Sequence, residues 1–148
     1  MNPTYSILIV DDDRKLLHDW EKILKNPNRK IVKAYSGYDA MRKMIRENIH
    51  LVITDIDMPV ENGPQMNGFD LIKYIKSNSK FKDINIIFTV DDHETMDDVV
   101  HGLEDGAIDY LMEPLHPALT KAKVAIFERL YFKSQLLKKE QEKTTRLL

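Results

Sequence analysis

Short apolar runs alternate with amphipathic segments along this chain, and this alternation constrains its fold more than any other feature. Between the runs, apolar residues recur every three or four positions, a spacing that is typical of helices buried on one face. Five strands that alternate with five helices predict an α/β fold, a doubly wound parallel sheet with helices on both faces. The predicted strands occupy 6–10, 30–35, 51–54, 84–89 and 108–112.

The length of 148 residues favours one domain with an appendage. We expect the domain to span residues 1–132 and to end in a long helix that begins near His116. From Lys133 onwards this helix becomes polar, so residues 133–148 are expected to form a helical extension or linker. The extension could lie in solvent, lead to an output domain beyond the chain, or pair with a second copy in a homodimer.

The composition excludes several classes of protein. The net charge of −2 argues against direct nucleic-acid binding, which needs a basic surplus. The absence of cysteine excludes disulfides and thiolate metal sites. No apolar run reaches the roughly 18 residues of a membrane span, and the N-terminus lacks the pattern of a signal peptide. We therefore expect a cytoplasmic protein that does not enter membranes.

Acidic residues follow two of the predicted strands: Asp11 and Asp12 follow the first, and Asp55 and Asp57 follow the third. In open α/β sheets the carboxyl ends of the strands border one crevice, where such proteins carry their chemistry. Like charges that meet there are costly unless a cation offsets them, and oxygen ligands suit Mg²⁺. The alternative interpretation is a set of solvated carboxylates that cap helices.

A carboxylate beside a bound cation can act as a nucleophile towards phosphorus. Thr89 ends the fourth predicted strand, where its hydroxyl could donate a hydrogen bond to a phosphoryl oxygen. Taken alone, Thr89 is most simply a β-branched strand residue. The histidines share no ligand spacing and are expected at the surface or at helix caps, whereas Met96 is expected in the core.

Five segments of the chain match motifs of one known family. They are ILIVDD at 7–12, LVITDIDMP at 51–59, NGFDL at 67–71, IIFT at 86–89 and GAIDYL at 106–111. Together, from about Tyr5 to Leu130, they resemble the receiver domain of two-component response regulators. The resemblance implies a flavodoxin-like sheet with strand order 2-1-3-4-5 and a role in phosphorelay signal transduction.

The same resemblance implies a role for each site residue. Asp55, four residues before Pro59, takes the position of the phosphoacceptor that a sensor histidine kinase modifies. Asp12 and Asp55 take the positions of direct Mg²⁺ ligands, and Asp11 that of a water-mediated one. The backbone carbonyl of Asp57 takes the position that completes the metal site. Thr89 and Tyr110 take the positions of the family's switch residues.

Three features depart from the family pattern. Glu113 stands where the family has a lysine whose ammonium pairs with the phosphoryl group, and a carboxylate there would repel that group unless it turns outwards or binds the cation. The Glu113-Pro114 bond is expected to be cis, as it is in the family. Val90 follows Thr89 where the family usually has a smaller residue, and the loop at 60–67 is about five residues longer than usual.

These departures leave more than one function open. The leading hypothesis is a signalling receiver that is not an enzyme. A pseudo-receiver that docks or dimerises without phosphorylation is the alternative, motivated by Glu113 and Val90. Asp55-Ile56-Asp57 also resembles the aspartate pair of haloacid-dehalogenase-type phosphatases, but no lysine ends the fifth strand. A dinucleotide-binding module is disfavoured because no glycine-rich motif follows the first strand.

Overall fold

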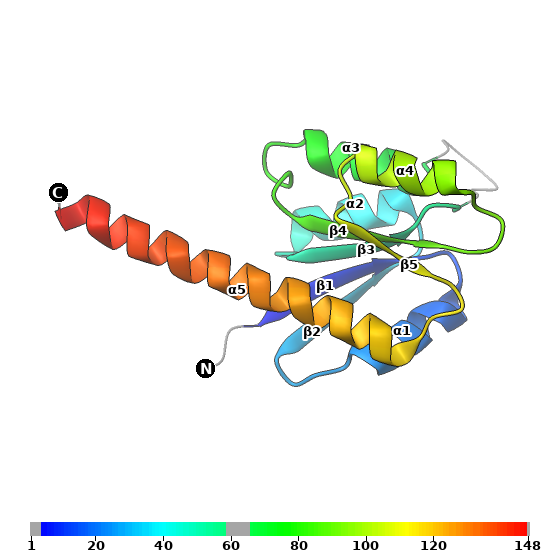
Figure 1. Ribbon diagram of the computed structural model, residues 1–148, viewed down its shortest axis with the longest axis horizontal. Helices are drawn as coiled ribbons and strands as arrows, with labels where there is room; N and C mark the ends of the chain where they lie inside the picture. Colours follow the sequence, from blue (N-terminus) through cyan, green and yellow to red (C-terminus); the bar gives the residue numbers. More distant parts are fainter. Residues whose placement is uncertain (1–3, 59–65, 148) are drawn as a thin grey trace.

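The computed structural model describes residues 4–58 and 66–147, and in these ranges five strands alternate with five helices (Figure 1). Most element boundaries fall within one or two residues of the prediction. The predicted loop at 60–67 lies largely outside the described residues. The elements are β1 (Tyr5–Val10), α1 (Arg14–Leu24), β2 (Arg29–Ala34), α2 (Gly37–Arg46), β3 (Leu51–Asp55), α3 (Gly68–Ser77), β4 (Asn85–Val90), α4 (Met96–Glu104), β5 (Asp109–Met112) and α5 (Pro117–Leu147).

All strand pairs are parallel, and the sheet has the order β2-β1-β3-β4-β5 that the sequence resemblance implied. Because every strand runs the same way, all five carboxyl ends lie along one edge of the sheet, and all five amino ends along the other. The register places Val10 opposite Thr54, and Asp55 opposite Thr89. The fold class is therefore confirmed.

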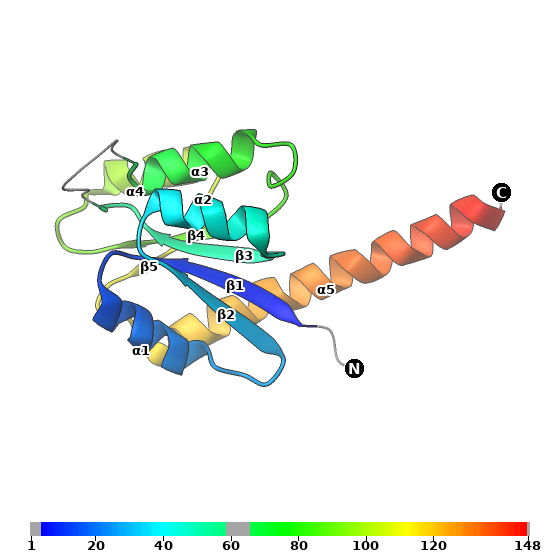
Figure 2. The same ribbon diagram turned by 180° about the vertical axis from the view of Figure 1, so that it is seen from behind.

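Two layers of helices cover the sheet, with α1 and α5 on one face and α2, α3 and α4 on the other (Figures 1 and 2). Alternate residues of β1 enter opposite cores, because successive side chains of a strand point to opposite faces. Ile7 and Ile9 pack towards α1 and α5 with Trp20, whereas Leu8 and Val10 pack towards α2, α3 and α4. This explains why β1 is an uninterrupted apolar run.

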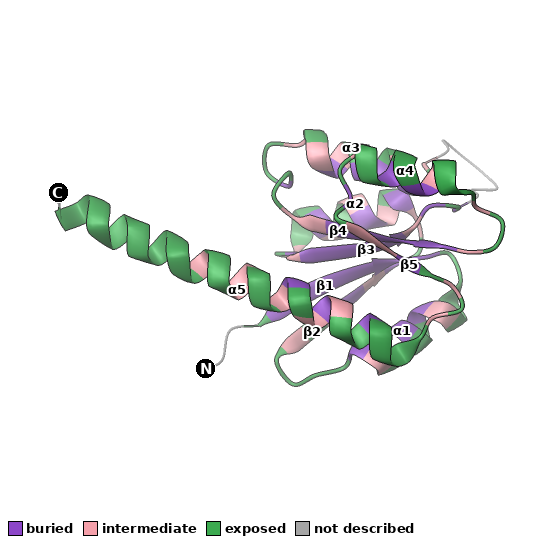
Figure 3. Ribbon diagram, viewed as in Figure 1, coloured by how far each residue is buried: buried purple, intermediate pink, exposed green. Residues whose placement is uncertain are grey.

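Helix α5 is a single helix of 31 residues that projects well beyond the sheet (Figure 1). Val124 and Phe127 are buried against the domain, but residues 138–147 are exposed (Figure 3). The extension predicted from Lys133 onwards is thus helical and continuous with the domain's last helix. Among the helices of the described residues, none combines the length and the apolar composition needed to cross a bilayer.

The expectation that Met96 belongs to the core is wrong, since this residue is 70% exposed. Thr95 caps α4: its side chain accepts a hydrogen bond from the Asp98 backbone, and the Asp98 carboxylate accepts one from the Thr95 backbone. Met96 is therefore the first residue of the helix and lies outside its buried side.

Candidate functional site

The structure brings together three of the predicted metal-ligating carboxylates at the carboxyl edge of the sheet. Asp11, Asp12 and Asp55 each offer a carboxylate oxygen, and these oxygens all lie within 4.8 Å of one another. Asp11 and Asp12 follow β1, Asp55 ends β3, and the two strands are hydrogen-bonded neighbours. The meeting of these groups is thus a direct consequence of the strand order.

Local backbone structure positions each of these side chains. The Asp11 carboxylate accepts a hydrogen bond from the Asp13 backbone N–H at 2.9 Å, which turns the chain into α1. On the other side, Gly68 lets α3 approach β3 closely. A Cβ atom at position 68 would lie 2.2 Å from the Asp55 carbonyl oxygen, so no other residue fits without moving the strand end.

Asp57 does not join the cluster through its side chain. It is exposed, and its backbone N–H donates to the Asp55 carboxylate at 3.3 Å. This contact orients Asp55. The role of the Asp57 carbonyl oxygen as a metal ligand stays a prediction.

Burial makes two carboxyl groups of the cluster unusually weak acids. Desolvation, together with repulsion from Asp11, Glu113 and Glu94, raises the pKa of Asp55 to about 8, although the hydrogen bond from Asp57 partly offsets these effects. Desolvation also raises the pKa of Asp11 to about 7, with further repulsion from Glu113 and Asp12, although the hydrogen bond from Asp13 partly offsets it. Without a cation, the cluster therefore holds protons at neutral pH, and a bound divalent ion would favour the charged carboxylates instead.

Glu113 lies at the same edge, immediately after β5. Its backbone N–H donates to the Val90 carbonyl at 2.7 Å, and the Glu113-Pro114 bond is cis, as expected from the family resemblance. Desolvation raises the pKa of the Glu113 carboxyl, and Asp91 and Asp13 raise it further. Of the two alternatives open for Glu113, an outward turn or binding of the cation, the outward turn does not fit its Oε1 atom, which is buried.

Thr89 is 1% exposed and lies near Glu113. Its hydroxyl is close enough to lower the pKa of the Glu113 carboxyl, yet no hydrogen bond of normal geometry joins the two groups. Within the described residues, neither Thr89 Oγ1 nor Glu113 Oε1 has a hydrogen-bond partner. Two buried oxygens without partners at one strand edge indicate room for a further group.

Tyr110 and Val90, the other residues singled out from the sequence, pack against the sheet. The half-buried Tyr110 ring stacks on Phe88, with 6.0 Å between centroids, and Lys123 donates a hydrogen bond to the Tyr110 carbonyl at 3.0 Å. Val90 is buried in the core beneath α2, α3 and α4. The switching role of Tyr110 and the effect of Val90 on access to Asp55 stay predictions.

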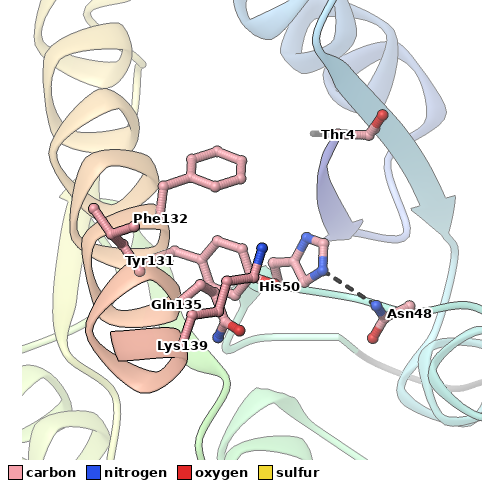
Figure 4. A pocket seen from close by; sticks show the side chains of 8 residues that line it. Thr4, Asn48, His50, Tyr131, Phe132, Gln135 and Lys139 are labelled. Atoms are coloured by element: carbon pink, nitrogen blue, oxygen red, sulfur yellow. Dashed lines mark hydrogen bonds between the residues drawn. The ribbon is translucent and has the colours of Figure 1, made fainter. Parts of the chain in front are cut away.

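A cavity of about 600 Å³ lies at the opposite edge of the sheet, between the amino ends of the strands and α5 (Figure 4). Its central residue is His50, whose ring stacks on Tyr131 with 4.4 Å between centroids. The His50 Nδ1 atom accepts a hydrogen bond from the Ser6 backbone N–H at 3.0 Å, and the Asn48 amide lies 3.3 Å from Nε2. The cavity is lined by Thr4, Asn48, His50, Tyr131, Phe132, Gln135, Leu136 and Lys139.

The expectation that every histidine lies at the surface or at a helix cap is wrong for His50. His116 does cap α5, because its Nδ1 atom accepts from the Leu119 backbone at 3.2 Å. The pairing of His50 with Ser6 arises from the register of β1 and β3, which no local sequence signal reveals. His50 connects two strands and α5, so its contacts are structural.

Comparison with known proteins gives a consistent result. The family model described as Response regulator receiver domain matches residues 7–125. The chain is 29% identical over 120 residues to the two-component response regulator ORR3 of rice, covering 78% of this chain and 85% of that protein. It is 29% identical over 126 residues to the chemotaxis protein CheY1 of Helicobacter pylori, covering 81% of this chain and 94% of the relative.

A solved structure shows the same fold. The signal receiver domain of a DNA-binding response regulator from Colwellia psychrerythraea 34H superposes with a TM-score of 0.76 and 28% sequence identity. The superposition covers 84% of this chain and 98% of that one. The 16% of this chain that the superposition leaves uncovered is comparable to the part of α5 that projects beyond the sheet.

Proposed function

This chain belongs to the response regulator receiver domain family, and from that premise we propose that it accepts a phosphoryl group on Asp55 from a sensor histidine kinase in a Mg²⁺-dependent reaction. The meeting of the Asp11, Asp12 and Asp55 oxygens within 4.8 Å is the observation that carries this proposal. In this role the chain is a component of two-component signalling, and not an enzyme with a released product.

The residues present fit Mg²⁺. All three side chains offer carboxylate oxygens, the ligands that this ion prefers, and one or two carboxylates with several waters are its usual protein environment. The raised pKa values of Asp11 and Asp55 show that charge is disfavoured in the pocket while no cation offsets it. When bound, the ion would keep Asp55 ionised and offset the charge on the phosphoryl oxygens.

The transfer itself needs an ionised Asp55. One carboxylate oxygen forms a bond to phosphorus while the phosphorus–nitrogen bond of the donor phosphohistidine breaks, and the imidazole nitrogen keeps that electron pair and takes up a proton. The Asp57 backbone N–H, hydrogen-bonded to Asp55, helps to orient the nucleophile. Thr89, opposite Asp55 in the β3–β4 register, has its hydroxyl free to donate to a phosphoryl oxygen.

We assign the output to the surface formed by α4, β5 and α5, where large apolar side chains are exposed. Phosphorylation can change the partner preference of this surface only through its differential interaction with two conformations. We place the exchange in the cytoplasm, where kinase and receiver would meet. The exposed residues include Met96, Val100, Leu103, Ile108, Met112, Leu119 and Ile126.

The proposal is tested by incubating the protein with Mg²⁺ and acetyl phosphate and measuring its intact mass. We expect the mass of one added phosphoryl group, lost on adding a chelator and absent in Asp55→Asn. Asp83→Asn is the matched control, because its exposed side chain lies before β4 at the opposite edge of the sheet, and it should be modified like the wild type. No mass increase in the wild type would instead favour a pseudo-receiver that acts by docking alone.

A further inference from the structure

Asp55 lies between two groups of oxygen atoms that belong to different strands. Asp11 and Asp12, after β1, lie on one side of it, and Thr89 and Glu113, at the ends of β4 and β5, lie on the other. Both sides adjoin Asp55, because β1 and β4 are the neighbours of β3, Asp55 is paired with Thr89, and Glu113 directly follows Met112, the partner of Val90. Only the β1 side belongs to the metal site considered so far.

One divalent ion leaves the pocket with excess negative charge. The two sides together hold four carboxyl groups, from Asp11, Asp12, Asp55 and Glu113, so one such ion offsets half of the charge that they carry when all four are ionised. Among the ion pairs of the described residues, none joins a lysine or arginine to any of these four groups. A phosphoryl group on Asp55 would add further negative charge at the same place.

A single ion does not reach all four carboxylates. In the described part of the chain, the oxygens within 4.8 Å of one another come from the three aspartates alone, and Glu113 is not among them. On the Glu113 side, however, two buried oxygens have no hydrogen-bond partner, namely Oγ1 of the almost fully buried Thr89 and Oε1 of Glu113. Buried polar atoms are nearly always satisfied, so these two atoms point to a missing ligand.

We propose that a second divalent cation binds on the β4–β5 side of Asp55, between the Asp55 and Glu113 carboxylates and the Thr89 hydroxyl. Two carboxylates, a hydroxyl and waters form a hard oxygen site for Mg²⁺ or Mn²⁺. Two divalent ions match the four carboxylates in charge. Paired ions about 3.5–4 Å apart that share an oxygen ligand are an established arrangement for phosphoryl transfer, and Asp55 would be the shared ligand here.

This inference rests on the proposed metal-dependent phosphorylation and makes Glu113 part of it. On this view Glu113 does not disable the site. It changes the source of the positive charge that faces the phosphoryl group from a side chain to an ion. Occupancy of the second site, and with it phosphorylation, would then depend on the concentration of divalent ions.

The test is a Mn²⁺ titration of the full chain, in which free Mn²⁺ is counted by electron paramagnetic resonance. We expect two bound ions per wild-type chain and one in Glu113→Gln, which preserves size while removing the charge. Thr89→Val should weaken the second ion about tenfold and leave the first unchanged. Asp83→Asn, at an exposed carboxylate before β4 on the opposite edge of the sheet, is the control and should bind two ions.

One ion per wild-type chain, with the same affinity in Glu113→Gln, would overturn the second site. Circular dichroism and thermal unfolding establish that each variant is folded, and Thr89→Val provides an independent readout if Glu113→Gln is not. Intact mass after treatment with acetyl phosphate separates the two proposals. Phosphorylation with one bound ion overturns the second site alone, whereas two bound ions without phosphorylation overturn the proposed function.

Discussion

The two edges of the sheet solve the problem of buried polar groups in opposite ways. At the amino edge, His50 is half-buried, its Nδ1 accepts a backbone hydrogen bond and its ring stacks on Tyr131. At the carboxyl edge, Asp11, Asp55 and Glu113 are desolvated next to one another, and all three have raised pKa values. At the first edge the chain itself satisfies His50, whereas the carboxylates of the second edge require protons or cations from outside.

The difference separates structural from functional polar groups. A buried group that satisfies its hydrogen bonds stabilises one conformation, whereas a buried charge without a partner destabilises the folded state until a ligand arrives. The carboxyl edge should therefore lower the stability of the protein as the pH rises, and divalent ions should restore it. The amino edge should lower the stability as the pH falls and should not respond to divalent ions. Four predictions follow this contrast, from the largest expected effect to the smallest.

Asp55→Asn should stabilise the metal-free protein in alkaline solution. The pKa of Asp55 is about 8 in the folded chain against an ordinary value of 3.8, so the folded state keeps a proton that the unfolded chain has released between these values. Stability therefore falls as pH rises through this window. At pH about 9 we expect the variant to gain about 3 kcal/mol in unfolding free energy, since partial exposure screens the full effect.

Urea unfolding with a chelator present measures this gain, and below pH 3.8 it should vanish because both states are then protonated. Asp57→Asn, at an exposed carboxylate, is the matched control and should change stability little at any pH. An Asp55→Asn variant no more stable than wild type at high pH would show that the carboxyl edge is as complete as the amino edge.

Addition of Mg²⁺ should stabilise the wild type at pH about 8. At a free concentration 100 times the dissociation constant, linkage predicts a gain of about 2.7 kcal/mol in unfolding free energy for one site. Thermal unfolding with and without Mg²⁺ measures it. His50→Gln should gain as much as the wild type, and Asp55→Asn much less. An equal gain in Asp55→Asn would place the ion elsewhere.

His50→Gln should cost about 1 kcal/mol at pH about 7.5, because the stack on Tyr131 is lost while glutamine can still accept a hydrogen bond. Burial lowers the pKa of His50 below its ordinary value of 6.5, so the unfolded chain gains a proton first as the pH falls. As the pH is lowered from 6.5, the wild type should therefore lose unfolding free energy, and the variant should lose less. Urea unfolding at two pH values checks this, and equal slopes in both proteins would contradict it.

Removal of residues 138–148 should have the smallest effect, less than about 0.5 kcal/mol in unfolding free energy. The residues described after Leu137 are exposed, and of these only Lys138 and Lys139 line the cavities beside His50. Differential scanning calorimetry of the shortened chain measures the effect, and phosphorylation of Asp55 should be unchanged. A loss above 1 kcal/mol would mean that the amino edge depends on the projecting helix, against the expected domain boundary near residue 132.

The sequence predicted those features in which local pattern and topology agree. The apolar run of β1, buried on both faces, followed by Asp11 and Asp12, was enough to predict a strand that ends in a site. Once the strands are parallel, Asp55 must lie at the same edge. The desolvation of Asp55 and the burial of the Glu113 oxygen depend on packing around the strand ends, so only the structure reveals them.

The misses have the same cause. The apolar spacing of α4 predicts that Met96 lies in the core, but the cap at Thr95 makes Met96 the first residue of the helix. The role of His50 depends on the alignment of two strands that are distant in sequence. Periodicity predicts which elements form, whereas helix ends and cross-strand contacts need three-dimensional information.

Helix α5 turns small motions of the domain into larger displacements. At a rise of about 1.5 Å per residue, the part of this helix beyond Phe127 is roughly 30 Å long, and a tilt of about 10° at its base would move its end by about 5 Å. Lys123 ties that base to the Asp109 carboxylate and the Tyr110 carbonyl in β5. A shift of the first residues of β5 that tilts α5 would therefore be larger at the far end of this helix.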